Sequence, residues 1–192
     1  MEARLISKRV IYTTLRAVHW NLQLKDRQVV TSLLEHKVYI GSLKMGKHTV
    51  IRYHDFCAGH TVTGHESKCK HLHGHNYRVH FHVRVREDLV ATNLDAVGRV
   101  IDFSVVKQLL CNWLEHQWDH KFLINKDDPR LAQLLEADSG SLVICNFNPT
   151  AENMAQYLVE VVGPAALEAT DVELFGVELE ETRKCSVSYF LD

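Results

Sequence analysis

A run of strict alternation from Tyr77 to Val85 constrains the fold more than any other feature of the sequence. One face of this run carries Tyr77, Val79, Phe81, Val83 and Val85, and the other face carries Asn76, Arg78, His80, His82 and Arg84. Side chains of a β-strand point alternately to its two faces, so this period of two predicts a long strand with one apolar face. Other elements of the chain must cover that face.

A second alternating segment, residues 50–60, ends in His60 on its own apolar face. Extended backwards, the phase of the 77–85 run places His73 and His75 on the apolar side, with Gly74 between them. Two strands are therefore expected to direct three imidazoles toward one place. Nine of the thirteen histidines lie between residues 48 and 82, and this crowding also points to a site.

Helical patterns follow these strands. Apolar residues recur at helical spacing from Phe103 to Leu114, and Asp102 or Ser104 is expected to cap the start of this helix. Residues 118–129 are interpreted as a connecting segment and a charged loop. A second helix is predicted to begin after Thr150 and to end at Gly163-Pro164. Its inner face is formed by Met154, Leu158 and Val162.

Two strands are predicted at the end of the chain, at residues 172–181 and 185–190. Alternation in the first of them places Phe175, Val177, Leu179 and Glu181 on one face. The order strand, strand, helix, helix, strand, strand predicts an α+β fold with the helices on one face of an antiparallel sheet.

Length and charge suggest one domain preceded by an extension. The chain has 192 residues, of which residues 1–48 carry nine lysines and arginines against three acidic residues, whereas the remainder carries thirteen against twenty-one. Residues 1–47 are therefore interpreted as a basic N-terminal extension, and residues 48–192 as the domain. The extension is either dispensable or a basic arm for a partner or for targeting.

Composition also narrows the class of protein. The net charge of −2 gives no reason to expect nucleic acid as a partner. No segment approaches the roughly 20 apolar residues of a membrane span, and the start does not resemble a secretory signal, so a cytoplasmic location is expected. Five scattered cysteines do not indicate a disulfide framework.

Three histidines form a known catalytic zinc shell, because three protein ligands leave a fourth position open for water or substrate. His60, His73 and His75 are thus candidate zinc ligands, with satisfied core or surface histidines as the alternative. Cys69, four residues before His73, is a candidate nucleophile or base. The other cysteines, Cys57, Cys111, Cys145 and Cys185, are interpreted as small buried hydrophobes.

Two further groups suit a reactive site. Asp119-His120 supplies a carboxylate and an imidazole for proton transfer, and its apolar neighbours suggest partial burial. Glu181 places a carboxylate at the end of an apolar stripe, which favours a ligand contact over a solvated surface residue.

Five motifs together resemble the 6-pyruvoyltetrahydropterin synthase family, which includes the 6-carboxytetrahydropterin synthase of queuosine biosynthesis. In chain order they are residues 56–60 (FCAGH), 69–75 (CKHLHGH), 119–120 (DH), 148–153 (NPTAEN) and 180–182 (EET). The resemblance covers roughly residues 48–190. It implies the tunnelling fold, a four-stranded antiparallel sheet with two helices in the order ββααββ. It also implies a homo-oligomer whose sheets join into a barrel, with active sites at subunit interfaces.

The resemblance also implies residue roles. His60, His73 and His75 would bind Zn²⁺, and Cys69 would accept a proton with Asp119 and His120 as its partners. Glu181 would anchor the pterin through its amino-pyrimidine edge, and Thr150 is implied as a further substrate contact. The implied substrate is 7,8-dihydroneopterin triphosphate, without a redox cofactor.

The loop around Cys69 indicates which of the family's reactions to expect. Three residues separate Cys69 from His73, as in the queuosine-pathway members, and Lys70 stands where glycolaldehyde-releasing members tend to carry glutamate. A 6-carboxytetrahydropterin synthase that releases acetaldehyde and triphosphate is therefore expected. The alternatives are a 6-pyruvoyltetrahydropterin synthase, which eliminates triphosphate, and a zinc- or pterin-binding module without catalysis. Gly59, where many relatives have alanine, departs from the family pattern.

Overall fold

The computed structural model describes residues 47–87, 89 and 94–192 of the chain. Residues 1–46 lie outside this part, so the basic extension and its boundary with the domain remain predictions. No helix among the described residues is both long and apolar enough to cross a membrane.

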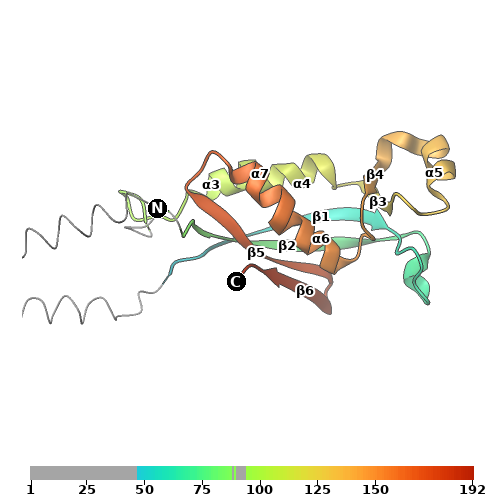
Figure 1. The fold of residues 1–192 in the computed structure, drawn as a ribbon, viewed down its shortest axis with the longest axis horizontal. Helices are drawn as coiled ribbons and strands as arrows, with labels where there is room; N and C mark the ends of the chain where they lie inside the picture. The colour runs from blue at the N-terminus through green and yellow to red at the C-terminus, as the bar shows by residue number, and fades with distance from the viewer. Residues whose placement is uncertain (1–46, 88, 90–93) are drawn as a thin grey trace, which may run out of the picture. The chain divides into compact units, whose positions relative to one another are not determined.

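The four predicted strands form consecutive neighbours in one antiparallel arrangement (Figure 1). They are β1 (Val50–His60), β2 (His73–Val85), β5 (Val172–Thr182) and β6 (Cys185–Phe190). β2 begins at His73, as the backward extension of its alternation predicts. Residues 56, 58 and 60 of β1 are buried, as are residues 77, 79, 81 and 83 of β2. The period of two therefore identified the covered face correctly.

The prediction of a purely four-stranded antiparallel sheet was wrong, because the sheet has six strands in the order β4-β3-β1-β2-β5-β6. β3 (Lys121–Asn125) pairs in parallel with the end of β1, and β4 (Leu142–Cys145) pairs in parallel with β3. Helix α5 (Leu131–Asp138) and the short turn η3 (Ser139–Ser141) connect them. Four or five residues are too few for a periodicity signal, and residues 118–129 were therefore predicted to be a connecting segment and a charged loop.

Two helical segments cover one face of the sheet (Figure 1). The first runs through α3 (Phe103–Val106), the π-helical turn η2 (Lys107–Cys111) and α4 (Asn112–Gln117). Its N-cap is Asp102, whose side chain accepts a hydrogen bond from the Ser104 amide. Val106, Leu110 and Leu114 of this segment are fully buried.

The second segment runs through α6 (Ala151–Tyr157), the π-helical turn η4 (Leu158–Val162) and α7 (Gly163–Leu167). Thr150 caps it as predicted, and its side chain accepts from the Asn153 amide. The predicted end at Gly163-Pro164 was wrong. Pro164 lies among the first residues of α7, just after the π-helical turn, where a missing amide proton is tolerated. Gly163 allows close packing, because a Cβ there would lie 2.8 Å from Leu174 Cβ.

A bulge in β5 changes which of its residues face the helices. The register shifts between His82 and Val83, so Leu174 pairs with Val83, and Leu174 is only 2% exposed. Phe175 is the extra residue and lies on the uncovered face, where Arg84 stacks over its ring. The prediction that Phe175 shares a face with Val177 was therefore wrong.

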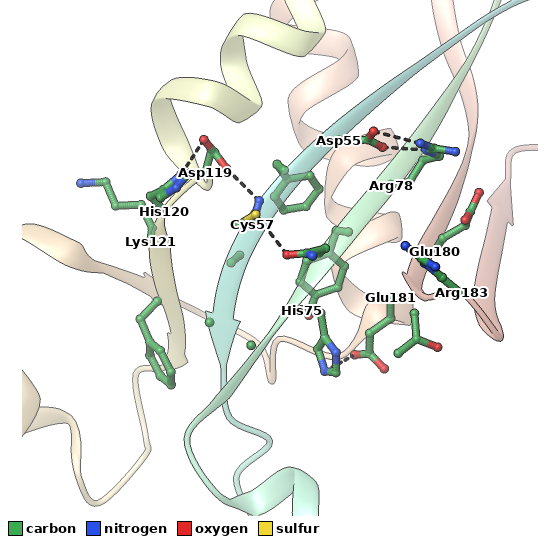
Figure 2. Close-up of a pocket in the computed structure, with 18 of the residues that line it drawn as sticks. Asp55, Cys57, His75, Arg78, Asp119, His120, Lys121, Glu180, Glu181 and Arg183 are labelled. Carbon is green, nitrogen blue, oxygen red and sulfur yellow. Dashed lines mark hydrogen bonds and ion pairs between the residues drawn. The ribbon is translucent and has the colours of Figure 1, made fainter.

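The uncovered face of the sheet carries ion pairs between neighbouring strands. Arg78 donates two hydrogen bonds to Asp55, at 2.6 and 2.9 Å (Figure 2), and His80 Nε2 lies 2.7 Å from Glu180 Oε1. Cys57, at the end of the same face, is exposed, and so is Cys185 on β6. The interpretation of these two cysteines as buried hydrophobes was wrong, whereas Cys111 and Cys145 are buried as expected.

Candidate active site

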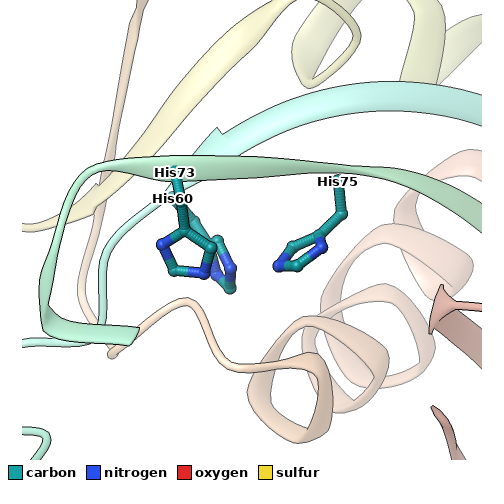
Figure 3. Close-up of side chains that lie close together, drawn as sticks. All are labelled: His60, His73 and His75. Carbon is teal, nitrogen blue, oxygen red and sulfur yellow. The ribbon is translucent and has the colours of Figure 1, made fainter. Parts of the chain in front are cut away.

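His60, His73 and His75 meet at one point beneath the covered face of the sheet (Figure 3). Register explains the meeting, since His60 pairs with His73 and Ala58 pairs with His75 across the antiparallel β1–β2 ladder. One nitrogen from each ring lies within 4.8 Å of the other two. Two strands thus bring together the three imidazoles that the alternation predicted.

The chemistry of these rings fits a metal ion. His60 is 2% exposed, its Nδ1 lies 2.6 Å from the Pro149 carbonyl oxygen, and its buried Nε2 has no hydrogen-bond partner among the described residues. His73 Nδ1 similarly lies 2.8 Å from the His71 carbonyl. A ring that donates through Nδ1 presents the lone pair of Nε2, the arrangement typical of metal-bound histidine.

Burial favours the metal-binding form of two of the three rings, those of His60 and His75. Desolvation lowers the pKa of His60 and of His75 below the ordinary value, and the neighbouring His73 acts in the same direction. The Pro149 hydrogen bond and Glu181 oppose this shift without reversing it at His60. Neutral imidazole is the ligating form, so the site is suited to a cation.

Two glycines allow the strands to carry this cluster. A Cβ at Gly74 would lie 2.9 Å from the Ala58 carbonyl oxygen and 3.3 Å from Gly59 Cα, both backbone atoms that cannot move alone. A Cβ at Gly59 would lie 2.3 Å from Cδ2 of the Phe122 ring. Residue 59 departs from the family pattern because it is glycine and not alanine. The Phe122 ring occupies the space that the methyl group of an alanine would need.

A cavity of about 300 Å³ adjoins the histidine cluster. His60, Cys69, Thr150 and Glu181 line it, together with Cys185 at the start of β6. The Glu181 Oε1 atom lies 3.6 Å from His60 Nε2 and 3.8 Å from His75 Nε2. One side of the cavity therefore offers nitrogen ligands, and a carboxylate and a thiol lie around them.

Cys69 lies in η1 (Lys68–Lys70), a short turn between the two ligand-bearing strands, and is half-buried. Within the described part of the chain, only the three histidines form a group able to hold a metal, and Cys69 does not join it. The cysteine thus shares the cavity without closing the metal site.

Asp119 and His120 do not line this smaller cavity. They follow α4, and His120 has a left-handed backbone with φ of 55°. That conformation brings His120 Nδ1 within 2.8 Å of Asp119 Oδ2, while Asp119 Oδ1 accepts a hydrogen bond from the Cys57 amide at 2.8 Å (Figure 2). Burial raises the pKa of Asp119, but these hydrogen bonds outweigh it and hold the pKa below its usual range.

This pair lines a second, larger cavity of about 1170 Å³, together with His75 and Glu181. The predicted partial burial is correct for Asp119, whose side chain is 26% exposed, and wrong for His120, whose side chain is 80% exposed. Cys69 does not line that cavity. His60, Cys69 and Thr150 therefore line the smaller cavity, His75 and the Asp119–His120 pair line the larger one, and Glu181 lines both.

Sequence reasoning missed Tyr77 as part of the site. Tyr77 is 1% exposed, its hydroxyl has no hydrogen-bond partner among the described residues, and its ring centroid lies 5.6 Å from that of His75. Burial raises the pKa of Tyr77 well above its usual range, and the charges of Glu181 and Cys69 add to this. Its position two residues after His75, on the same face, was the available signal.

Comparisons with known proteins show which family the chain belongs to. The family model for 6-pyruvoyl tetrahydropterin synthase matches residues 49–191. A Rickettsia bellii protein named 6-carboxy-5,6,7,8-tetrahydropterin synthase is 34% identical over 134 residues, which are 69% of this chain and 93% of the relative. A Synechocystis protein of the same name is 33% identical over 136 residues, which are 70% of this chain and 87% of the relative.

Solved structures share the fold. An uncharacterized protein from Wolinella succinogenes superposes with a TM-score of 0.64 at 24% identity, over 77% of this chain and all of that one. A Plasmodium vivax 6-pyruvoyltetrahydropterin synthase carrying a mutated catalytic residue gives 0.54 at 18% identity, over 77% of this chain and 99% of that one. The family model matches most of this chain, and the five motifs agree with it. The chain therefore belongs to the 6-pyruvoyl tetrahydropterin synthase family.

Proposed function

We propose that the chain is a zinc-dependent 6-carboxy-5,6,7,8-tetrahydropterin synthase. It would convert 7,8-dihydroneopterin triphosphate with loss of acetaldehyde and triphosphate, the reaction used in queuosine biosynthesis. The names of the curated relatives and the spacing from Cys69 to His73 support this choice.

One observation carries the proposal: three imidazoles converge on one point, and one of them, His60, lines a cavity together with a thiol and a carboxylate. A purely structural zinc site is normally closed by a fourth protein ligand, and Cys69 is not part of the ligand group. The arrangement therefore favours an enzyme over a binding module. A bound zinc ion would polarise the hydroxyl and carbonyl oxygens of the substrate side chain and lower the pKa of the hydroxyls.

The side chains around the cavity supply the remaining functions. Glu181 would accept hydrogen bonds from the amino-pyrimidine edge of the pterin, and Thr150 would contribute to holding the ring at the same wall. Cys69 would remove a carbon-bound proton from the substrate side chain as general base. Tyr77 would close the apolar side of the site, because its ring lies against both His60 and His75.

We further propose that the Asp119–His120 pair acts on the cavity of a neighbouring subunit in a homo-oligomer. The His120 imidazole is exposed on its own chain, and the pair lines a cavity that Cys69 does not line, which supports this arrangement. His75 and Glu181 of the same chain also line that cavity. Asp119 would hold the imidazole through Nδ1, leaving Nε2 to exchange a proton with the partner's site.

The decisive experiment is product identification. The purified full chain is loaded with zinc and incubated with 7,8-dihydroneopterin triphosphate, and the pterin is identified by mass spectrometry while acetaldehyde is assayed separately. We expect 6-carboxytetrahydropterin together with acetaldehyde. A pyruvoyl product without acetaldehyde would instead assign the triphosphate-eliminating reaction, and binding without turnover would leave a pterin-binding module.

A further inference from the structure

A buried carboxylate lies behind the loop that carries Cys69. The side chain of Asp128 has no solvent exposure, although the residue belongs to the segment between β3 and α5. Its Oδ2 accepts hydrogen bonds from Thr63 Oγ1 and from Arg130 Nη2, both at 2.7 Å, and its Oδ1 accepts from Arg130 Nε at 2.9 Å. These hydrogen bonds hold the pKa of Asp128 well below its usual range, and the bond from the Arg130 side chain has the largest effect.

The guanidinium continues from this carboxylate to the loop itself. Arg130 Nη1 donates to the Lys70 carbonyl oxygen at 2.8 Å, and Nη2 donates to Thr61 Oγ1 at 2.8 Å. Thr61 Oγ1 in turn donates to the same Lys70 carbonyl at 2.9 Å. The two contacted residues are sequence neighbours of functional ones, since Thr61 follows His60 and Lys70 follows Cys69.

No hydrogen bond holds the Cys69 thiol within the described part of the chain, and η1 contains no buried residue. The place of the thiol is therefore set by its backbone. The Cys69 carbonyl accepts from the Val62 amide at 2.9 Å, and the next carbonyl, that of Lys70, is the one held by Arg130. Hydrogen bonds rather than apolar packing fix this turn.

A stabilising role alone does not account for such a pair. Removing a carboxylate from water costs several kcal/mol, and buried ion pairs are often no more stabilising than apolar residues of similar size. A planar guanidinium that binds one carboxylate through two nitrogens, however, fixes geometry as well as distance. The Asp128–Arg130 pair is thus suited to holding the turn at one distance from His60.

We propose that Arg130, oriented by Asp128, is a positioning residue that sets the place of the Cys69 thiol relative to the histidine cluster. This inference rests on the proposed function for its effect on turnover, but the position of the thiol is measurable without substrate. Loss of the guanidinium should loosen residues 61–72 and leave the three histidines on their strands.

The test compares Arg130→Ala and Arg130→Lys with the wild-type chain, and uses Arg84→Ala as the matched control. Arg84 also forms a close ion pair, 2.7 Å from Glu173, but on the uncovered face of the sheet. Each protein is treated with iodoacetamide over a range of pH, and alkylation of Cys69 is resolved by peptide mass spectrometry. Cys57, which is exposed, serves as the internal reference.

We expect Arg130→Ala to raise the rate of Cys69 alkylation relative to Cys57 by about tenfold, as expected when a turn opens more often. Zinc content should stay at the wild-type level, while kcat falls by about 10- to 100-fold with little change in KM, since a small misplacement of a reacting group is costly. Arg130→Lys should restore part of both effects, and Arg84→Ala should show neither.

An unchanged alkylation ratio in folded Arg130→Ala would overturn the proposal, as would an equal change in Arg84→Ala. If Arg130→Ala does not fold, Arg130→Lys and Thr61→Val carry the same comparison, because each removes only part of the network. Failure of the wild-type chain to form product would contradict the proposed function instead, and the alkylation comparison would still decide the role of Arg130.

Discussion

At the scale of single residues, the hydrogen bond between His60 Nδ1 and the Pro149 carbonyl decides which ring nitrogen is left for a metal. Pro149 lies directly before the cap of α6, so the second helix of the fold orients a ligand on the first strand. Such a partner fixes both the tautomer and the plane of the ring. Sequence alone could not supply this contact, because 89 positions separate the two residues.

Replacing His75 by alanine should remove zinc and activity together, since two imidazoles are too few for a three-histidine site. The same holds for His73→Ala. Metal content of the purified variants, measured by atomic emission, checks the prediction. His82→Ala is a suitable control, because His82 belongs to the same strand but to its uncovered face, where its ring lies 4.9 Å from that of Phe190. Full zinc occupancy in His75→Ala would contradict the assignment.

Cys69→Ala separates an enzyme from a binding module. If Cys69 is the base, the variant should keep zinc and bind pterin, while turnover falls by about 10²–10⁴-fold. Cys111→Ala is the control, because Cys111 is fully buried in the first helical segment and burial raises the pKa of its thiol.

Both turnover and zinc content are measured for these variants. Wild-type product formation by Cys69→Ala would make His120 the leading candidate for the base. Loss of zinc as well would instead assign Cys69 as a fourth ligand.

At the scale of elements, long alternating runs were sufficient to predict β1, β2, β5 and β6 and the covered face of β1 and β2. The parts that failed have local physical reasons. β3 and β4 are too short for a periodicity, and the bulge of β5 adds one residue without a sequence signal. The contact between Asp119 and His120 likewise depends on a left-handed backbone at a residue that is not glycine.

Gly74→Ala tests whether the approach of β1 and β2 holds the metal site together. The added methyl group would press on the Ala58 carbonyl and Gly59, so the strands must separate between His73 and His75. We expect a loss of stability of about 1–3 kcal/mol, as for other overpacked sites. Zinc affinity should fall by about 10- to 100-fold, because the ligands lose their support.

Thermal unfolding and competition with a zinc chelator measure the two effects. Gly140→Ala is the control, since a Cβ there would meet only the Asp138 carboxylate at an ordinary 3.6 Å. Wild-type zinc affinity in Gly74→Ala would show that the strands can adapt without disturbing the cluster.

At the scale of the whole molecule, a chain that starts at Met45 should keep its fold and its turnover. All five family motifs and both cavities lie beyond this point, and residues 47–192 form a compact unit. Circular dichroism, zinc content and turnover of the truncated protein check the prediction. An insoluble or inactive truncation would make residues 1–44 part of the domain.

Mixed oligomers test whether Cys69 and His120 of different subunits complete one active site. Neither Cys69→Ala nor His120→Ala should be active alone. When the two are co-expressed with different tags and the mixed oligomers are purified, about a quarter of the interfacial sites should combine an intact Cys69 with an intact His120, if subunits assemble at random. Turnover per zinc should recover accordingly.

The matched control pairs Cys69→Ala with His75→Ala. Cys69 shares a cavity with His60, and His75 completes the metal cluster of the same chain, so no arrangement of these two variants restores a site. Recovery in the first mixture but not in the second requires that the Asp119–His120 pair serve a neighbouring chain. No recovery in either mixture would place Cys69 and His120 in the same subunit's site, and His120 would then have to reach the smaller cavity by a movement of the residues that follow α4.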